Sequence, residues 1–198
     1  IENGRVSGIQ LADGQTIQGD SYVCALPFNV LRNTLPAEIT KTPFFSGISK
    51  FTSSPIIGIH IWYDRIVMDQ ELVTFLESPI QWVFNKSLIQ SHINTQSQHI
   101  CISLSSAWSH INTTKEKLSD LFTSEMKKLF PRAQDAKIEK FLVVKEKHAT
   151  FRSLPGSNKY RPSQITSIPN LFLAGDWTNT GWPSTMEGAV RSGVFAAH

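Results

Sequence analysis

The residues best suited to chemistry lie near the C-terminal end of the chain. An apolar run, 170–174, ends on Gly175 and Asp176, and a loop containing Gly181 and Pro183 follows. A carboxylate placed directly after a strand can accept hydrogen bonds from a ribityl or ribose hydroxyl, and a preceding glycine lets a ligand approach the backbone. The other interpretation is structural, because an aspartate at such a place also caps a turn.

The segment after Pro183 has the pattern of a helix whose first turn could face a cofactor. Ser184 and Glu187 have the spacing of a capping box. The free N–H groups of a first turn favour an acceptor oxygen or developing negative charge, such as a reduced flavin carries at its pyrimidine edge. Gly188 and Gly193 each cost about 1 kcal/mol of helix propensity relative to Ala, which suggests close approach to the helix backbone.

One face of this predicted helix is apolar and built mostly from small residues. Such a face is expected to pack tightly against a sheet. Its members recur at helical spacing: Met186, Ala189, Val190, Gly193, Val194 and Ala197.

The elements that must position this segment begin at the other end of the chain. Residues 1–26 predict a small antiparallel meander with hairpin turns at Asn3-Gly4 and Asp13-Gly14. The apolar run 19–27 suits a strand buried on both faces of a parallel sheet, although an ordinary sandwich strand has the same local pattern. A short helix is predicted over 28–35, before Pro36.

The middle of the chain predicts a mixed α+β region. Four runs have strand patterns: 55–63, 81–84, 100–105 and 138–144. A polar loop is expected over 86–98. A helix is predicted over 113–130, with Thr113 and Glu116 as its capping box, and its apolar stripe is interpreted as core packing.

The overall composition excludes some classes of protein. The 198 residues carry 40% hydrophobic and 18% charged side chains, with a formal net charge of +3. This excess is small and scattered, so we expect no nucleic-acid partner. No apolar run is long enough to span a bilayer, and any membrane contact is therefore expected to be peripheral.

The cysteines and histidines suggest neither a metal site nor a disulfide framework. Cys24 and Cys101 are far apart and form no CxxC pair, which fits two buried thiols in a reducing, cytoplasmic setting, with a disulfide left open. His60 is interpreted as a packed strand residue. His110 and His148 have no partner at metal-ligand spacing.

Two segments resemble a known motif. Phe172–Trp177 and Trp182–Gly193 are similar to the C-terminal FAD motif of the flavin amine oxidase and phytoene desaturase superfamily, with the nearest likeness to squalene-associated FAD-dependent desaturases, the hydroxysqualene dehydroxylases. Ile59–Arg65 and Gln81–Asn85 resemble strands of that group's substrate domain.

The resemblance implies an α/β plus α+β fold. The chain would hold the C-terminal part of a Rossmann-like FAD-binding domain with an inserted mixed-sheet substrate domain. The implied boundaries give the FAD-binding domain residues 1–27 and 161–198, and the substrate-binding domain residues 28–160.

The resemblance also implies a set of cofactor-binding residues. Gly175 and Asp176 would contact the pyrophosphate and ribityl chain of FAD, and Trp182 would lie near the flavin ring. Thr185, Met186 and Glu187 would place the helix N-terminus under the pyrimidine edge. Pro183 and Ala189 complete this predicted set.

The dinucleotide fingerprint GxGxxG is absent from the sequence. Since the chain starts at Ile1 in a turn and ends within a predicted helix, we expect a piece of a longer protein. It would hold half of an FAD site and be inactive alone.

The function implied by the resemblance is FAD-dependent oxidation or reduction of a lipophilic isoprenoid. The first hypothesis is dehydroxylation of hydroxysqualene to squalene. Carotenoid desaturation and amine or protoporphyrinogen oxidation are alternatives within the flavoenzymes, and a non-catalytic binding module is an alternative of another class. No catalytic residue is assigned, because the flavin itself performs hydride transfer.

Overall fold

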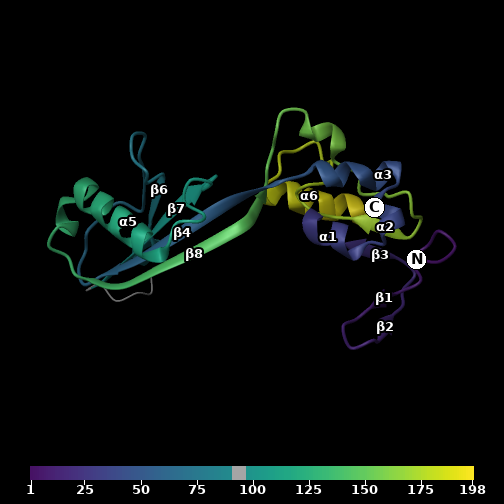
Figure 1. The fold of residues 1–198 in the computed structure, drawn as a ribbon, viewed down its shortest axis with the longest axis horizontal. Helices are drawn as coiled ribbons and strands as arrows, with labels where there is room; N and C mark the ends of the chain where they lie inside the picture. Colours follow the sequence, from purple (N-terminus) through teal and green to yellow (C-terminus); the bar gives the residue numbers. More distant parts are fainter. Residues whose placement is uncertain (91–96) are drawn as a thin grey trace. The chain divides into compact units, whose positions relative to one another are not determined.

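The computed structural model describes residues 1–90 and 97–198, which divide into two compact units (Figure 1). Unit 1 contains Ile1–Thr52 and Phe151–His198, and unit 2 contains Ser53–Thr150. These boundaries differ from the predicted ones, because residues 28–52 and 151–160 pack with the two ends of the chain.

Aromatic packing explains this difference in the boundaries. The rings of Phe28, Phe51 and Phe151 meet edge to face, with centroids 4.9 to 6.0 Å apart. The ring of Trp177 lies 6.3 Å from that of Phe51. Edge-to-face pairs are favourable arrangements of aromatic rings, so residues from both sides of the predicted boundary share one core.

A two-stranded parallel sheet lies at the centre of unit 1. β3 (Tyr22–Cys24) pairs with β9 (Leu171–Leu173), and Val23 lies opposite Phe172. The parallel pairing confirms the parallel sheet predicted for the run 19–27. The expected burial on both faces is wrong, since Tyr22 is buried while the side chain of Val23 is 57% exposed.

Short helices and a hairpin complete unit 1. The helices before the first long strand are α1 (Phe28–Thr34), α2 (Ala37–Thr40), α3 (Pro43–Ser46) and the 3-10 helix η1 (Gly47–Lys50), and η3 (Ser157–Tyr160) and α6 (Met186–Ala197) follow later. The hairpin of β1 (Ile9–Gln10) and β2 (Thr16–Ile17) is antiparallel. Its predicted turn is confirmed by Gly14 at φ +87°. Each of its strands has two residues, and both isoleucines remain half exposed.

Unit 2 is a five-stranded sheet with one helix on one face (Figure 1). The strand order is β5 (Leu72–Thr74), β6 (Trp82–Asn85), β7 (Gln98–Ser105), β4 (Ser53–Tyr63) and β8 (Ile138–Phe151). The β5–β6, β6–β7 and β7–β4 pairs are antiparallel. α5 (Lys115–Leu129) buries Leu118, Phe122 and Met126 against the inward side chains of the strands, while η2 (Pro131–Ala133) follows it.

The predicted strands of the middle region are confirmed, with two differences. β8 continues to Phe151, well beyond the predicted end at residue 144, and β5 was not predicted. The predicted capping box of α5 is wrong by one residue. Thr114, not Thr113, is the N-cap, and its Oγ1 accepts a hydrogen bond from the Lys117 amide at 3.4 Å.

The predicted loop over 86–98 is also wrong at its start. α4 (Lys86–Ile89) stands there because the Asn85 Oδ1 accepts a hydrogen bond from the Leu88 amide at 3.3 Å and caps the helix. β7 already begins at Gln98. The part of this prediction that covers 91–96 lies outside the described residues.

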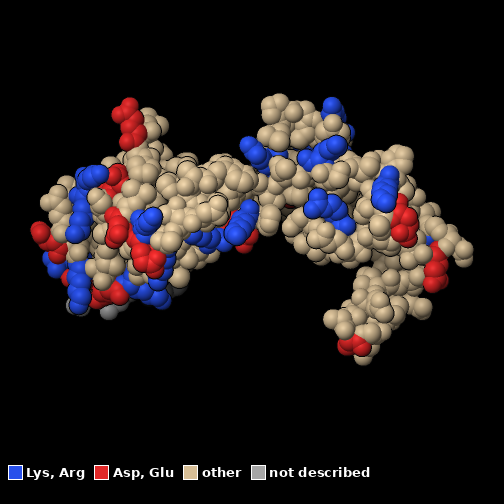
Figure 2. Space-filling view, in the orientation of Figure 1, with Lys and Arg blue, Asp and Glu red and all other residues tan. Residues whose placement is uncertain are grey.

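The surface of unit 2 carries charges of both signs, interspersed in the view of Figure 2. Within the described ranges, no helix is long and apolar enough to cross a membrane. Cys24 and Cys101 are free thiols with intermediate exposure, and burial raises the pKa of both.

Candidate functional site

The predicted site residues all lie in unit 1, on the turn after β9 and the first turn of α6. The helix starts later than its predicted capping box. Thr185 is the N-cap, and its Oγ1 accepts a hydrogen bond from the Gly188 amide at 3.4 Å. The Ser184–Glu187 box is therefore wrong. Ser184 instead donates its hydroxyl to the Asp176 carboxylate, and Glu187 forms an ion pair with Arg191 at 2.7 Å.

The buried face of α6 also differs from the predicted apolar face. Met186 is 89% exposed and Val190 is 65% exposed, whereas Gly188, Ser192 and Ala196 are buried. Close contacts between α6 and the preceding loop and turn explain why this face is buried. A Cβ at Gly188 would lie 2.6 Å from the Pro183 carbonyl oxygen, and the Ser192 hydroxyl accepts a hydrogen bond from the Gly175 amide at 2.7 Å. The expected close approach thus holds at Gly188. At Gly193 an added Cβ would meet nothing within 4 Å.

Gly175 is required by the turn itself. Its φ of +144° lies in a region that L side chains rarely adopt, and an added Cβ would lie 2.5 Å from the Trp177 Nε1. The buried Trp177 indole in turn donates from Nε1 to the Leu26 carbonyl at 3.1 Å. This bond ties the Gly-Asp turn to the segment that leaves β3.

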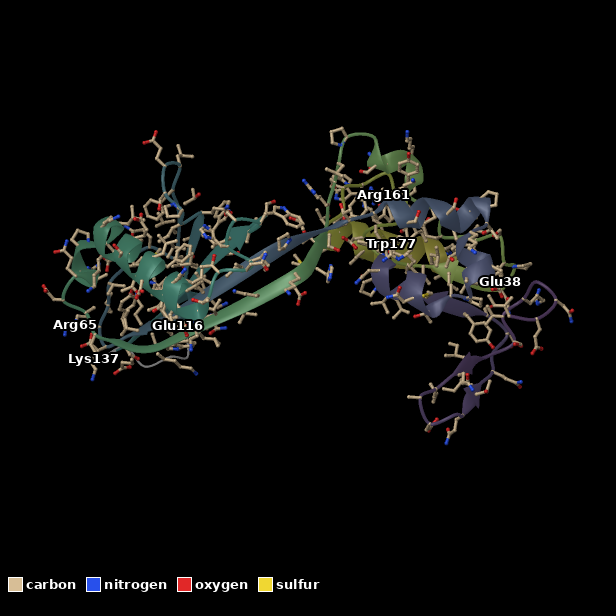
Figure 3. All side chains as sticks on the ribbon, in the orientation of Figure 1. Glu38, Arg65, Glu116, Lys137, Arg161 and Trp177 are labelled. Carbon is tan, nitrogen blue, oxygen red and sulfur yellow. The ribbon has the colours of Figure 1, made fainter. Side chains whose placement is uncertain are left out.

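Arg161, labelled with Trp177 in Figure 3, donates hydrogen bonds to the backbone of this turn. Its buried guanidinium donates to three carbonyl oxygens, those of Asp176 at 2.6 Å, Trp177 at 3.3 Å and Trp182 at 2.8 Å. Burial lowers the pKa of Arg161, and the charge of Asp176 partly offsets this. Sequence reasoning missed this residue, because an arginine before Pro162 in a loop has no spacing that links it to Asp176.

Two uncharged side chains fix the same turn. The Thr178 hydroxyl donates to the Gly175 carbonyl at 2.8 Å. The buried Gln164 amide donates to the Thr178 Oγ1 at 2.9 Å and to the Asn179 carbonyl at 3.0 Å. Buried polar groups that are fully hydrogen-bonded make a segment rigid, so the backbone of the turn is preorganised.

The outer part of the site is formed by Trp182 and the first turn of α6. The Arg191 guanidinium lies 4.2 Å from the centre of the Trp182 ring and also pairs with Glu187. Arg191 thereby brings together two predicted site residues. Trp182 stays 41% exposed and available to a ligand. The remaining predicted residues, Pro183, Thr185 and Ala189, are exposed at the surface.

This arrangement can bind a polar cofactor. Among the described residues, the amides of Met186 and Glu187 have no hydrogen-bond partner, as expected for a helix start. The half-buried Asp176 carboxylate keeps acceptor capacity beyond its bond from Ser184. Acceptor, free donors and an exposed aromatic ring lie on consecutive short segments, which fits the hydroxyls and the acceptor atoms of a flavin dinucleotide.

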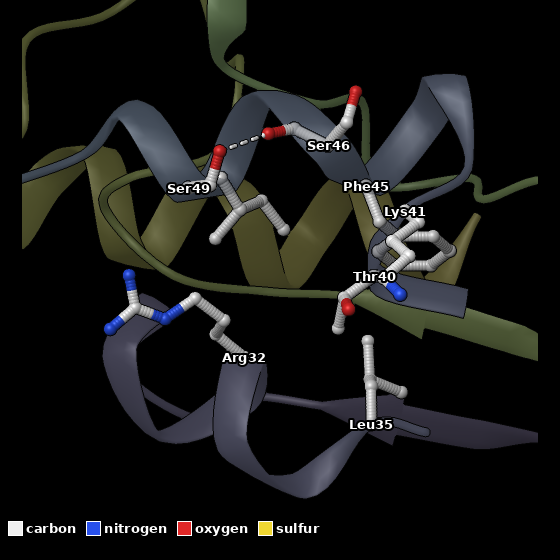
Figure 4. A pocket seen from close by; sticks show the side chains of 8 residues that line it. Arg32, Leu35, Thr40, Lys41, Phe45, Ser46 and Ser49 are labelled. Carbon is white, nitrogen blue, oxygen red and sulfur yellow. Dashed lines mark hydrogen bonds between the residues drawn. The ribbon is translucent and has the colours of Figure 1, made fainter. Parts of the chain in front are cut away.

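A separate hollow of about 340 Å³ in unit 1 contains none of the predicted site residues (Figure 4). It is lined by Arg32, Leu35, Thr40, Lys41, Phe45, Ser46, Ile48 and Ser49. The Ser49 hydroxyl donates to the Ser46 carbonyl at 2.7 Å, so this hydroxyl already has a partner within the wall.

Comparison with known families supports the cofactor. Residues 2–198 match the family model described as flavin containing amine oxidoreductase. The chain therefore belongs to this family of FAD-dependent oxidoreductases, and the prediction of the superfamily, of FAD and of an enzyme is confirmed.

Two relatives illustrate which members of the family this chain is similar to in sequence. A 15-cis-phytoene desaturase from Synechococcus elongatus is 31% identical over 203 residues, covering 100% of this chain and 43% of that protein. A hydroxysqualene dehydroxylase from Sinorhizobium fredii is 26% identical, covering 97% of this chain and 42% of that protein. The chain thus spans less than half the length of either relative. The nearest likeness expected from the sequence was the dehydroxylases, whereas the desaturase match is the stronger of these two.

Solved structures share the fold at low sequence identity. A putative protoporphyrinogen oxidase from Exiguobacterium superposes with a TM-score of 0.73 at 10% identity, covering 100% of this chain and 44% of that one. Cyclohexylamine oxidase from Brevibacterium oxydans superposes with a TM-score of 0.68 at 14% identity, covering 96% and 45%. Both share the combination of sheets and helices seen here.

Proposed function

We propose that unit 1 supplies the flavin side of an FAD site and unit 2 a surface for a long isoprenoid substrate. In this proposal, residues 1–52 and 151–198 are part of a Rossmann-like FAD-binding domain, and residues 53–150 are an inserted substrate domain. The whole protein would oxidise or reduce a lipophilic isoprenoid, which it would reach by peripheral contact with a membrane.

The observation that carries the cofactor assignment is the preorganised Gly175–Asp176 turn beside the free N-terminus of α6. Asp176 would accept hydrogen bonds from ribityl or ribose hydroxyls. The Met186 and Glu187 amides would face the pyrimidine edge, where the helix dipole favours negative charge. Bound FAD would supply the hydride chemistry, and these residues would bind and orient it.

The cofactor assignment is tested in the complete natural gene product. Asp176→Ala is expected to weaken FAD binding about tenfold to a hundredfold, because hydrogen bonds to a charged acceptor contribute about 1.5 to 3 kcal/mol each. FAD retention is measured by flavin absorbance and fluorescence after gel filtration. Asp20→Ala, on an exposed turn of the same unit, is the matched control. Equal retention in both variants would contradict the assignment.

Two substrate classes remain, and each has its own support. Desaturation of a phytoene-like hydrocarbon is favoured by the stronger relative, and removal of a hydroxyl from a hydroxysqualene-like substrate is supported by the second. The test is incubation of the FAD-loaded protein with phytoene, hydroxysqualene and cyclohexylamine, followed by chromatography of the products. Turnover of the amine alone would reject the isoprenoid proposal.

A further inference from the structure

The sheet of unit 2 has one face packed against α5 and a second face with partly exposed side chains, which we call the open face. Side chains alternate between the two faces along a strand. Apolar and aromatic residues of β6, β4 and β8 therefore project onto the open face: Trp62, Trp82, Phe84, Leu142 and Val144. Trp82, Leu142 and Val144 are 40% to 50% exposed.

A pair of histidines lies within this apolar face. His60 Nδ1 and His99 Nε2 are 3.0 Å apart, and the His99 ring stacks on the Trp62 ring with centroids 4.1 Å apart. The sheet register produces this contact, since His99 lies opposite Trp62 and Cys101 opposite His60. The interpretation of His60 as a packed strand residue is thus only partly right. Alternation turns it away from the flanking isoleucines of the core.

Burial and the charged groups that face the pair favour its neutral form. Burial, the neighbouring histidine and two lysines lower the pKa of His99 to about 4, and burial and Lys86 lower that of His60. Lys86 comes from α4 and Lys140 from β8. The Lys140 Nζ lies 4.7 Å from the centre of the Trp62 ring. The third neighbour, the Cys101 thiol from β7, lies 3.9 Å from His60 Nε2, and burial raises its pKa. A protonated amine placed here would meet two cations.

Each neutral imidazole has one N–H and one acceptor nitrogen. If His60 donates to His99, the outer Nδ1 of His99 is a donor. If His99 donates to His60, the same Nδ1 is an acceptor. The described residues offer this nitrogen no partner. A hydroxyl satisfies both tautomers because it donates and accepts, a carboxylate satisfies one, and a hydrocarbon satisfies neither.

We propose that the His60–His99 pair is a specificity-determining hydrogen-bonding point for the hydroxyl of a long, uncharged and otherwise apolar ligand on the open face. The inference deepens the proposed function and rests on it, because it selects oxygen-bearing isoprenoids over pure hydrocarbons. The aromatic and aliphatic side chains bind the chain of the ligand. The outer nitrogen of His99 binds its oxygen.

The test compares ligands that share one chain and differ in one end group. Hexadecanol, hexadecane, palmitate and hexadecylamine are titrated in detergent micelles against the complete gene product, with tryptophan fluorescence as the readout. We expect hexadecanol to bind about tenfold tighter than hexadecane, as one hydrogen bond allows. Equal binding of the two would overturn the proposal. Tightest binding of palmitate would assign the site to the lysines, and tightest binding of hexadecylamine would contradict the charge argument.

Variants of His99 separate hydrogen bonding from packing. His99→Phe keeps a flat ring against Trp62 and is expected to remove the preference for hexadecanol while hexadecane still binds. His99→Gln restores a donor and an acceptor, and is expected to recover part of the preference. His148→Phe, an exposed histidine further along β8, is the matched control. Preference lost in the control, or kept in His99→Phe, would reject the role of the pair.

The outcome is distinguishable from failure of the proposed function. Flavin absorbance of every variant is recorded beside the titration. A protein that holds FAD and converts phytoene without preferring the alcohol would overturn the histidine proposal alone. A protein that prefers the alcohol but lacks FAD would overturn the cofactor assignment alone.

Discussion

Both units have an apolar core, but the segments proposed to meet ligands are held in different ways. Unit 2 buries an extensive apolar core between one sheet face and α5, with Ile57, Ile59 and Phe122 fully inaccessible. Unit 1 holds its functional turn with hydrogen bonds from Arg161 and Gln164 to backbone carbonyls. Both units leave large apolar side chains exposed, such as Val190 in unit 1 and Trp82 in unit 2.

This difference fits the roles proposed for the two units. Apolar packing is non-directional, whereas hydrogen bonds fix atoms in place. A sheet packed on one side can offer its other side to an apolar ligand. A turn that presents a carboxylate and free amides to a cofactor, as proposed here, needs the defined backbone geometry that Arg161 and its neighbours impose.

The largest expected effect tests the apolar core of unit 2. Phe122→Ala removes a fully buried ring and is expected to lower the free energy of unfolding by about 3 to 5 kcal/mol. Urea unfolding followed by circular dichroism measures the change. Phe195→Ala, whose ring on α6 is 47% exposed, is the control and is expected to stay within about 0.5 kcal/mol. Similar losses in both would remove the contrast between the units.

The next effect tests the hydrogen-bonded turn of unit 1. Arg161→Ala leaves three carbonyl oxygens without their donor and is expected to cost about 2 to 3 kcal/mol. The same unfolding experiment measures it, and Arg161→Lys is expected to recover only part, because one ammonium lacks the planar fork of guanidinium. Arg65→Ala, at an exposed ion pair of unit 2, should have a much smaller effect. A loss at Arg161 no larger than that at Arg65 would show that hydrogen bonding does not hold the turn.

A pH experiment tests the histidine pair of unit 2. Its pKa values are lower in the folded than in the unfolded chain, so the unfolded chain binds protons first as the pH falls. Stability is therefore full above pH 6.5 and declines towards pH 4, by no more than about 1 kcal/mol once solvent screening of the partly exposed rings is included.

The urea midpoint at pH 7 and at pH 4.7 measures this decline. Asp64 and Glu116 also have lowered pKa values, with ordinary values of 3.8 and 4.5, and their contribution cancels in a comparison with a variant that keeps both groups. The double variant His60→Asn, His99→Asn is expected to lose less stability over the same range. An equal loss would mean that the pair is not the source.

The smallest expected effect concerns an unpaired group in the unit 2 core. The Tyr63 hydroxyl is buried and, among the described residues, has no hydrogen-bond partner, and burial raises its pKa. Tyr63→Phe is expected to stabilise the protein by about 0.5 kcal/mol, since an unsatisfied buried hydroxyl is removed. Thermal unfolding measures the shift, with Tyr160→Phe in unit 1 as the matched control. A clear destabilisation would indicate a partner for the hydroxyl.

Much of unit 2 could be predicted from local pattern. The strand containing residues 55–63 and the helix containing Leu118 and Phe122 follow periodicities of two and 3.6, which their one-sided burial confirms. The missed elements are short. α4 depends on a single cap from Asn85, and β5 has only three residues, so neither presents a full period to recognise.

The candidate site could be predicted from its motif, but the side chains that hold its backbone in place could not. The Gly175–Asp176 turn and a helix beginning near residue 185 follow from glycine, aspartate and a helical pattern in sequence. The predicted buried face of α6 was wrong because apolar periodicity favours large side chains. Gly188 is buried instead because it contacts Pro183, and Ser192 because it hydrogen-bonds to Gly175.

The sequence by itself determined the family, the cofactor and the longer elements of the fold, since these depend on residues close together along the chain. Only the tertiary structure decided which carbonyl groups Arg161 binds and which face of α6 is buried. It also decided that His60 contacts His99, which lies 39 residues away on another strand. Such contacts join residues whose separation in sequence carries no period. They arise when strands pair in one register and when a buried donor finds the carbonyls that the fold leaves open.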